Sequence, residues 1–256
     1  MRAFIAFLKK EILEGIRNGK FMLLGILFFA FGIMNPAIAK LTPWLMDIMS
    51  EELMQSGMIV TEVSVDALTS WTQFFKNIPM ALIVLVLVYG GCFVKEYESG
   101  SLVLMLTKGL SRSKVVLAKS FVMLFVWSTG YLLCFGVTYA YNVYFWDNSI
   151  ANELVFAVAY WWLFGIFVIS LTVLFSVLLK GYGGVLLGTG TAVLASYLVG
   201  LLPKLTKYMP SYLMNSGVIV YGVQKAEDYF VAAIITAAVS VLCIVVSIPV
   251  FNKKQI

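Results

Sequence analysis

The sequence predicts an all-α integral membrane protein with six transmembrane helices, and three observations support this. Six stretches of 18 to 27 residues contain no Asp, Glu, Lys or Arg: 21–39, 77–94, 120–146, 154–179, 181–203 and 229–252. A helix of about 20 residues crosses the hydrocarbon core of a bilayer. Hydrophobic residues make up 61% of the chain, far more than in soluble domains. The period-two alternation of a membrane β-barrel is missing, so the spans should be helices.

The first segment, residues 1–20, predicts an amphipathic helix at the membrane interface. Helical spacing places five apolar residues on one face: Phe4, Ile5, Leu8, Ile12 and Ile16. Charged residues occupy other parts of the helical wheel, and Phe7 does not fit the pattern. A basic amphipathic helix lies flat at the headgroup boundary. The alternative is a plain positive leader that only sets the topology.

The first span is expected at about 21–39, followed by an extracellular segment, 40–76. Thr42-Pro43 has the form of a helix cap followed by a helix-starting proline. The new helix either shapes the outer exit of a transport path or packs on the membrane surface. A signal peptide cleaved after Ala39 is a competing interpretation, but the leader and the apolar run are both long for one.

Spans two and three are expected at about 77–94 and 117–144, joined by segment 95–116. Gly100 and Gly109 bracket a short apolar helix, and Ser111 is placed to cap the helix that leads into span three. The apolar residues of this short helix include Leu102, Leu104 and Leu106. Apolar side chains beside a membrane indicate burial against a partner or lipid.

The last three spans are expected at about 154–179, 184–203 and 229–252, with segment 204–228 between spans five and six. That segment is too often interrupted by Pro and Gly for a seventh crossing and too apolar for a free loop. These elements use nearly the whole chain, so residues 1–256 form a single transmembrane domain.

The distribution of basic residues predicts that both termini are cytoplasmic. With that orientation 13 of the 18 Lys and Arg lie in inside segments and 5 in outside segments. Cytoplasmic loops are the ones that carry this excess. The net charge of +5 therefore reflects membrane orientation, and we infer no nucleic-acid binding from it.

The missing residue types exclude several kinds of chemistry. The chain has no His, which removes the usual pH 7 base and the commonest zinc ligand. No phosphate-binding GxxxxGK[ST] motif occurs, and the three Cys have no metal-binding spacing. We therefore expect no catalytic residues, no metal and no cofactor in this chain. Ion coupling is disfavoured because the spans lack ionisable groups, although a sodium-coupled carrier with broken helices stays open.

The connection between spans two and three resembles that of permease subunits of ABC transporters of the type-2 exporter class. In that family an acidic residue precedes Gly-[ST]-Leu, a Leu-rich stretch, a Ser-Arg pair and a later Lys. The matching positions here are Glu98, Gly100-Ser101-Leu102, Leu106, Ser111-Arg112 and Lys119. Ser101 stands where Thr is commoner. The resemblance extends in plan to the whole chain and implies a re-entrant or interfacial pair of short helices in 204–228.

The resemblance implies a function as the permease of an ATP-driven exporter in a bacterial plasma membrane. Two copies of a separate ATPase would bind ATP and Mg²⁺, and two permease chains would form a homodimer. The coupling segment would contact the ATPase through Glu98, Gly100, Ser101, Leu102, Leu104, Leu106, Gly109 and Arg112. A hydrophobic or amphipathic cargo, such as a peptide, suits the charge-free spans. The alternatives are an ion-coupled carrier or channel, and a non-transporting scaffold subunit.

Overall fold

The computed structural model describes residues 2–55, 65–107 and 109–254, and the side chains at 2, 3, 45–47, 49–55, 98 and 104 lie outside the described part. Its helices, with η marking the 3₁₀ type, are α1 (Arg2–Arg17), α2 (Lys20–Gln55), α3 (Ala67–Tyr89), α4 (Val94–Glu98), α5 (Ser101–Thr107), α6 (Arg112–Phe145), η1 (Asn148–Ile150), α7 (Leu154–Leu178), α8 (Tyr182–Gly200), η2 (Thr206–Tyr208), η3 (Pro210–Tyr221), η4 (Ala226–Tyr229) and α9 (Phe230–Lys253).

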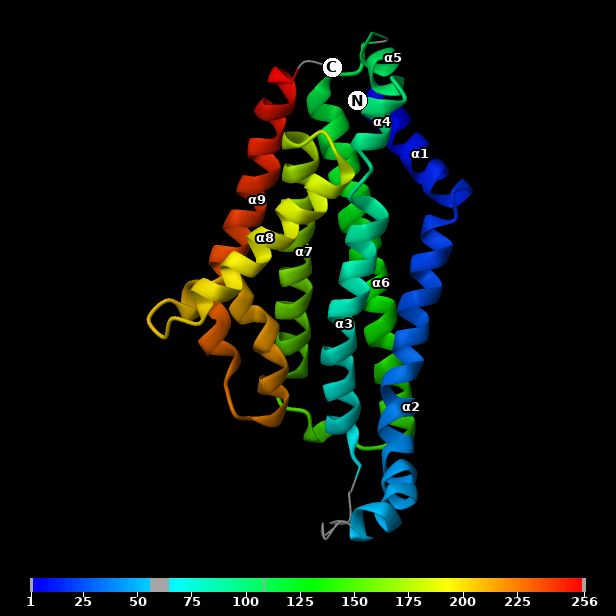
Figure 1. Ribbon diagram of the computed structural model, residues 1–256, viewed down its shortest axis with the longest axis vertical. Coiled ribbons are helices and arrows are strands. Elements are labelled where there is room, and N and C mark those ends of the chain that lie inside the picture. Colours follow the sequence, from blue (N-terminus) through cyan, green and yellow to red (C-terminus); the bar gives the residue numbers. More distant parts are fainter. Residues whose placement is uncertain (1, 56–64, 108, 255–256) are drawn as a thin grey trace.

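Six of the described helices are long and apolar enough to cross a membrane: α2, α3, α6, α7, α8 and α9. The predicted fold class is therefore confirmed. Figure 1 shows α1, α4, α5 and the last turn of α9 at one end of the bundle, which we call the terminus-bearing end. An even number of spans places both chain ends on one side.

Helix α6 joins the two parts of the bundle. It packs against α1, α2 and α3 on one side and against α7 and α9 on the other. Helix α8 is peripheral and crosses α7 at an angle (Figure 1). Only Val185 and Thr189 of α8 are buried, so most of this apolar helix faces outward.

Aromatic rings packed against glycines form the centre of the bundle. Gly165 on α7 lies so close to Trp127 on α6 that a Cβ would come within 2.2 Å of its ring. The indole Nε1 of Trp127 donates to the carbonyl of Trp162, 3.1 Å away. A side chain at Gly165 would therefore push α6 and α7 apart.

The start of the second span and the end of the first differ from the sequence prediction. α2 continues through Pro36 and Pro43 to Gln55, so the expected helix start at Thr42-Pro43 is wrong. The Thr42 hydroxyl donates to the carbonyl of Ile38 in the preceding turn, 2.8 Å away, rather than capping a new helix. α3 begins at Ala67, capped by Asp66, whose Oδ1 accepts from the Thr69 N–H at 3.0 Å.

Three 3₁₀ segments, η2, η3 and η4, lie between α8 and α9, and η3 and η4 are the pair of short helices that the sequence indicates there. η3 packs against α3, α7, α8 and α9. Hydrogen bonds fix it to α7: the Trp161 Nε1 donates to the Met214 carbonyl at 2.9 Å, and the Ser216 hydroxyl donates to the Ala157 carbonyl at 2.8 Å. The entry of this pair into the membrane stays a prediction.

A chain of neutral side chains links the first three spans; we call Asn35, Asn77 and Thr138 the neutral network. Asn77 Nδ2 donates to Asn35 Oδ1 at 2.8 Å, and Asn35 Nδ2 donates to Thr138 Oγ1 at 2.9 Å. Thr138 Oγ1 in turn donates to the carbonyl of Gly32 at 3.1 Å. Pro36 has no N–H to bond that carbonyl four residues earlier. The Thr138 hydroxyl supplies the missing donor.

Candidate functional site

Helices α4 and α5 form a projection at the terminus-bearing end, which we call the α4–α5 projection (94–107). Gly100 and Gly109 have φ angles of +65° and +87°, a left-handed conformation that glycine adopts without strain. The chain reverses at these two residues, and α5 lies between them (Figure 1). The two glycines therefore shape the projection, as the sequence suggests.

The side chains of α5 divide into an inner and an outer face. Leu102 is 1% exposed and belongs to the core, and Met105 and Leu106 pack partly buried against it. Val103 is 43% exposed. Leu102 and Leu106 therefore hold α5 onto its own bundle, and Val103 is the apolar side chain that α5 presents outward among those described.

The remaining predicted coupling residues have different surroundings. The Ser101 hydroxyl lies 2.8 Å from that of Ser99, at the first turn of α5. Glu98 ends α4 and Leu104 lies within α5, but the side chains of both are outside the described residues.

Arg112, predicted to contact a partner, bonds within its own chain. Its Nη1 donates to the carbonyls of Phe251, Asn252 and Lys254 at 2.9, 3.2 and 2.5 Å. The last carbonyls of a helix have no partner inside it and carry partial negative charge. Arg112, the first residue of α6, therefore caps the end of α9.

The other helices that end here are capped in the same manner. Lys254 Nζ donates to the carbonyls of Val177 and Leu179 at the end of α7, at 2.6 and 3.1 Å. The Tyr182 hydroxyl donates to the Leu87 carbonyl in the last turn of α3 at 2.7 Å. Side chains thus fix the end of α9 to α6, the end of α7 to the residue that follows α9, and the end of α3 to α8.

Helix α1 packs on the bundle through Phe7 and through part of the apolar face predicted for the membrane interface. Phe7, the residue that does not fit the sequence pattern, is 5% exposed, whereas Ile5 and Ile16 are 61% and 57% exposed. Phe4, Leu8 and Ile12 are partly buried against the core. α1 therefore has one apolar face against the protein and a second one, with Ile5 and Ile16, turned away from it.

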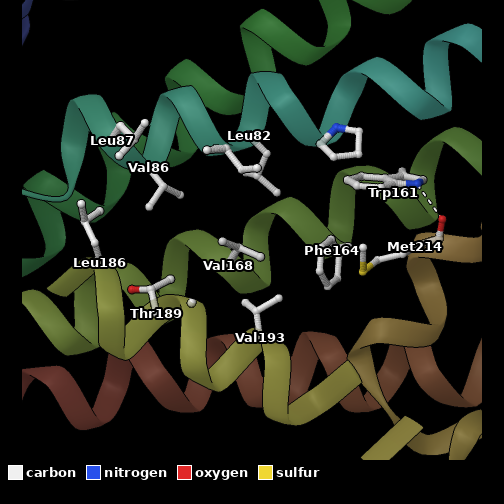
Figure 2. Close-up of a pocket in the computed structure, with 13 residues that line it drawn as sticks. Leu82, Val86, Leu87, Trp161, Phe164, Val168, Leu186, Thr189, Val193 and Met214 are labelled. Atoms are coloured by element: carbon white, nitrogen blue, oxygen red, sulfur yellow. Dashed lines mark hydrogen bonds between the residues drawn. The ribbon is translucent and has the colours of Figure 1, made fainter. Parts of the chain in front are cut away.

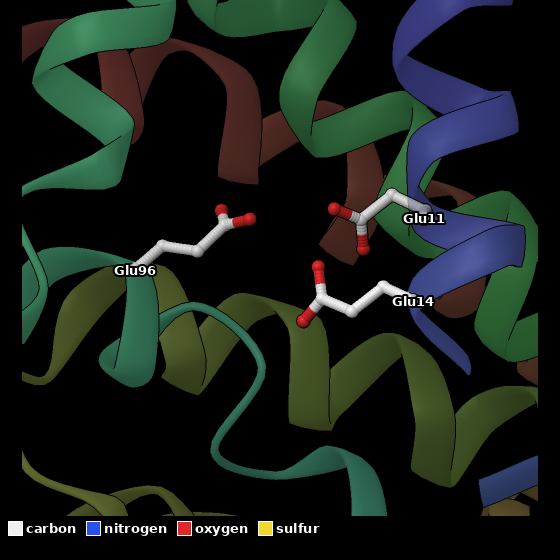
Figure 3. A group of neighbouring side chains, drawn as sticks. All are labelled: Glu11, Glu14 and Glu96. Atoms are coloured by element: carbon white, nitrogen blue, oxygen red, sulfur yellow. The ribbon is translucent and has the colours of Figure 1, made fainter. Parts of the chain in front are cut away.

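Five charged residues join α1, α4 and α6, and we call them the charged cluster: Lys10, Glu11, Glu14, Glu96 and Lys119. Figure 3 shows the three carboxylates turned toward one another. Their oxygens lie within 4.8 Å of each other, a spacing that would suit a metal ion. Lys10 Nζ lies 2.9, 2.7 and 2.7 Å from Glu11, Glu14 and Glu96. An ammonium has three donors, so Lys10 takes the place of such an ion.

Lys119 binds the inner side of the cluster. Its side chain is 3% exposed, and its Nζ lies 3.0 Å from Glu11 Oε2 and 3.2 Å from Glu96 Oε2. The same Nζ donates to the Cys92 carbonyl at 3.3 Å. Lys119 thus donates hydrogen bonds to α1 and to the turn between α3 and α4, and it forms an ion pair with α4.

The pKa values of two groups on α1, Glu11 and Lys10, follow from these contacts. Burial opposes the charged form of Glu11, but Lys119 and Lys10 outweigh it and hold the pKa of this carboxyl below its usual value. Burial also lowers the pKa of the Lys10 ammonium, yet its hydrogen bonds to Glu14, Glu96 and Glu11 raise it overall. Both groups are therefore charged at neutral pH.

The charged cluster was not predicted from the sequence, although one signal for it is present there. The prediction placed Lys119 in the family motif without a structural role and selected Glu98 instead of Glu96. In α6 the buried residues around Lys119 include Val115, Val116, Val122 and Met123. A lysine at three or four residues from each of these lies on the core-facing side of the helix, so it needs a buried partner.

An apolar groove between α3, α7 and α8 is the second candidate site. Its volume is about 320 Å³, and its lining is Pro79, Leu82, Ile83, Val86, Leu87, Trp161, Phe164, Val168, Leu186, Thr189, Gly190, Val193 and Met214. Figure 2 shows Leu82, Phe164 and Val193 facing this space from the three helices. The Trp161 Nε1 is already bonded to Met214, so the groove offers mainly apolar contact.

Comparisons with known proteins agree with this architecture. The family described as "ABC-2 family transporter protein" matches residues 5–199. The uncharacterized transmembrane protein YxlG of Bacillus subtilis (strain 168) is 21% identical over 254 residues, which cover 95% of this chain and 93% of that protein.

Proposed function

The chain belongs to the ABC-2 family of transporter proteins, and on that premise we propose that it is the permease subunit of an ATP-driven exporter. A separate ATPase would bind at the terminus-bearing end. The observation that carries this proposal is the α4–α5 projection. Its helix α5 lies past the end of the second candidate span, at the terminus-bearing end, and is attached to the bundle through Leu102.

The outer face of α5 suits a docking partner better than lipid. Val103 is exposed on α5, which lies between Gly100 and Gly109. The left-handed conformation of both glycines sets α5 apart as a short projecting helix. Exposed basic residues surround the ends of the helices here, among them Lys95, Lys180 and Lys253. This charge fits the cytoplasmic side of a membrane, which is where ATP is available.

A second copy of the chain would pack against α8 and close the apolar groove. Leu187, Leu194 and Leu198 on α8 are 73%, 55% and 54% exposed. Gly190, beside them, leaves open space where a Cβ would lie, and small residues allow close helix approach in membranes. The homodimer would thus enclose a path lined by two such grooves.

The lining of the groove suggests the cargo class. Its side chains are apolar apart from Thr189, and apolar sites with few polar groups bind hydrophobic ligands. We therefore propose export of a hydrophobic or amphipathic molecule, with an amphipathic peptide as the first candidate.

The decisive experiment uses an ATPase encoded beside this chain that carries a phosphate-binding loop. The two are co-purified and reconstituted in vesicles, and cargo movement is measured against ATP hydrolysis. Val103→Asp should abolish ATP-driven transport without loss of folded permease, and Val103→Leu should retain it. Transport by the chain alone on a sodium or pH difference would instead support the ion-coupled alternative, and failure to bind any ATPase would contradict the proposal.

A further inference from the structure

We infer that Lys119, with Glu11 and Glu96, is the joint that makes α1, the α4–α5 projection and the start of α6 move together during transport. This inference rests on the proposed function, because it names the residues through which movement of α5 reaches the spans. We treat the three as positioning residues, since none is placed to touch ATP or cargo.

The first step is the break between α3 and α4. α3 ends at Tyr89 and α4 begins at Val94, so the α4–α5 projection is not a rigid extension of the second span. The carbonyl of Cys92, which lies in this break, accepts a hydrogen bond from Lys119 Nζ at 3.3 Å. A side chain of α6 therefore fixes the place where the projection would otherwise bend.

The second step is the burial of the charges. Lys119 and Glu96 are 3% and 7% exposed, and Glu11 is 11% exposed. Separating any of them would leave an unpaired charge away from water, which is strongly unfavourable. Because of this, a displacement of α4 should carry α1 and α6 with it and should not open the cluster.

The third step is the placement of the neighbouring rings. Phe93 and Phe7 lie beside the ammonium, with ring centroids 5.5 and 5.9 Å from Lys119 Nζ. Phe93 precedes α4 and Phe7 belongs to α1, so the apolar contacts join the same elements as the ion pairs. Water is thereby kept from the ion pairs, and the joint has little freedom to rearrange.

The test separates a mechanical role from a merely structural one. Lys119→Met removes the cation alone. The triple variant Glu11→Gln/Glu96→Gln/Lys119→Met removes every charge of the joint, so it restores folding stability without restoring the ion pairs. Lys95→Met is the matched control, because Lys95 is exposed on α4 beside Glu96 and no described ion pair includes it.

The variants are measured as permease–ATPase complexes in vesicles, by cargo moved per ATP hydrolysed. We expect the triple variant to fold as the original does and to lose about tenfold in this ratio, a typical coupling effect. Lys95→Met should keep the original ratio. A triple variant with an unchanged ratio would overturn the inference.

A second measurement does not depend on the ATPase. Spin labels are placed at Lys9 on α1 and Val103 on α5, both exposed, in a variant whose three Cys are replaced. The distance between them should be narrowly distributed in the original cluster and broad in the triple variant. Distance distributions of equal width in the two proteins would contradict the inference that these residues form a joint. If no ATPase binds the unaltered chain but the distances respond as expected, the proposed function fails while the joint stands.

Discussion

The charged cluster and the neutral network each contain two buried residues, Glu96 and Lys119 in one and Asn35 and Thr138 in the other. Both join three helices, yet they use different chemistry. The cluster joins α1, α4 and α6 with five charges at the terminus-bearing end. The network joins α2, α3 and α6 with two amides and a hydroxyl inside the spans. A charge at the centre of a bilayer costs about 2.5–3.5 kcal/mol on insertion scales, so ions are placed near an end and amides further in.

This difference in chemistry also determines how much stability each region loses when one of its residues is replaced. Removal of one member of a buried ion pair leaves an uncompensated charge, whereas an unpaired amide in a membrane bundle often finds another partner. We therefore expect the cluster to be the more fragile of the two, and the following experiments compare them directly.

The largest effect should come from Lys119→Met. Glu11 and Glu96 would then be left with Lys10, which is 39% exposed and also pairs with Glu14. The buried side of the cluster would carry excess negative charge, and we expect a loss of about 3–5 kcal/mol in the free energy of unfolding. Denaturant titration of the purified protein in detergent micelles measures this. The control Lys95→Met, at an exposed position, should stay within about 0.5 kcal/mol; equal losses for the two variants would contradict the account of the cluster.

Acid should weaken the cluster and leave the neutral network unchanged. The folded-state pKa of Glu11 is lowered, so its contribution is present above its unfolded value of about 4.3. It is lost as the pH falls through the lower folded value. Unfolding measured between neutral pH and about pH 3 should show this loss, and Glu11→Gln should reduce the pH dependence. An unchanged dependence in Glu11→Gln would assign the acid effect to other carboxyls.

Asn35→Ala should cost less than Lys119→Met. It removes the bonds to Thr138 and Asn77, and hydrogen bonds between helices in membranes contribute about 0.6 to 1.7 kcal/mol each. A double-mutant cycle with Asn77→Ala measures the coupling of the two amides. A loss as large as that of Lys119→Met would show that neutral and charged junctions are equally fragile.

Thr138→Val should have the smallest effect on the free energy of unfolding. The size of that effect should depend on Pro36. The variant leaves the Gly32 carbonyl without its donor and Asn35 Nδ2 without this acceptor, at a cost of about 0.6 kcal/mol for each bond. With Pro36→Ala the backbone N–H at position 36 becomes available to that carbonyl. Thr138→Val should then cost less in the Pro36→Ala background, as unfolding titrations of the four proteins would show; an equal cost would contradict the role given to Pro36.

The spans could be predicted from sequence because hydrophobic length is a strong and local signal. The charge-free criterion also caused errors, since it started span two at residue 77, after the Ala67 start of α3, and it left Lys119 just outside the charge-free stretch of span three. Lys, Glu and Asp are tolerated in the terminal turns of spans when they are paired or capping, as Asp66 and Lys119 are. If the helical periodicity of span three is extended to the residues before its charge-free stretch, Lys119 falls on the buried face of that helix.

The partners within the candidate site could not be predicted in the same way. The choice between Glu96 and Glu98 depends on the direction of α4, which the break after Tyr89 sets. The capping of α9 by Arg112 joins residues far apart in sequence. Such contacts follow from how the spans pack, and one sequence does not determine that packing.

The position of Lys10 among three carboxylates has a consequence for the environment in which the protein works. Its ammonium acts as a built-in counter-ion, covalently attached and present at a fixed stoichiometry. A rise in calcium or magnesium therefore meets three carboxylates that are already paired with lysines and whose charge is largely offset.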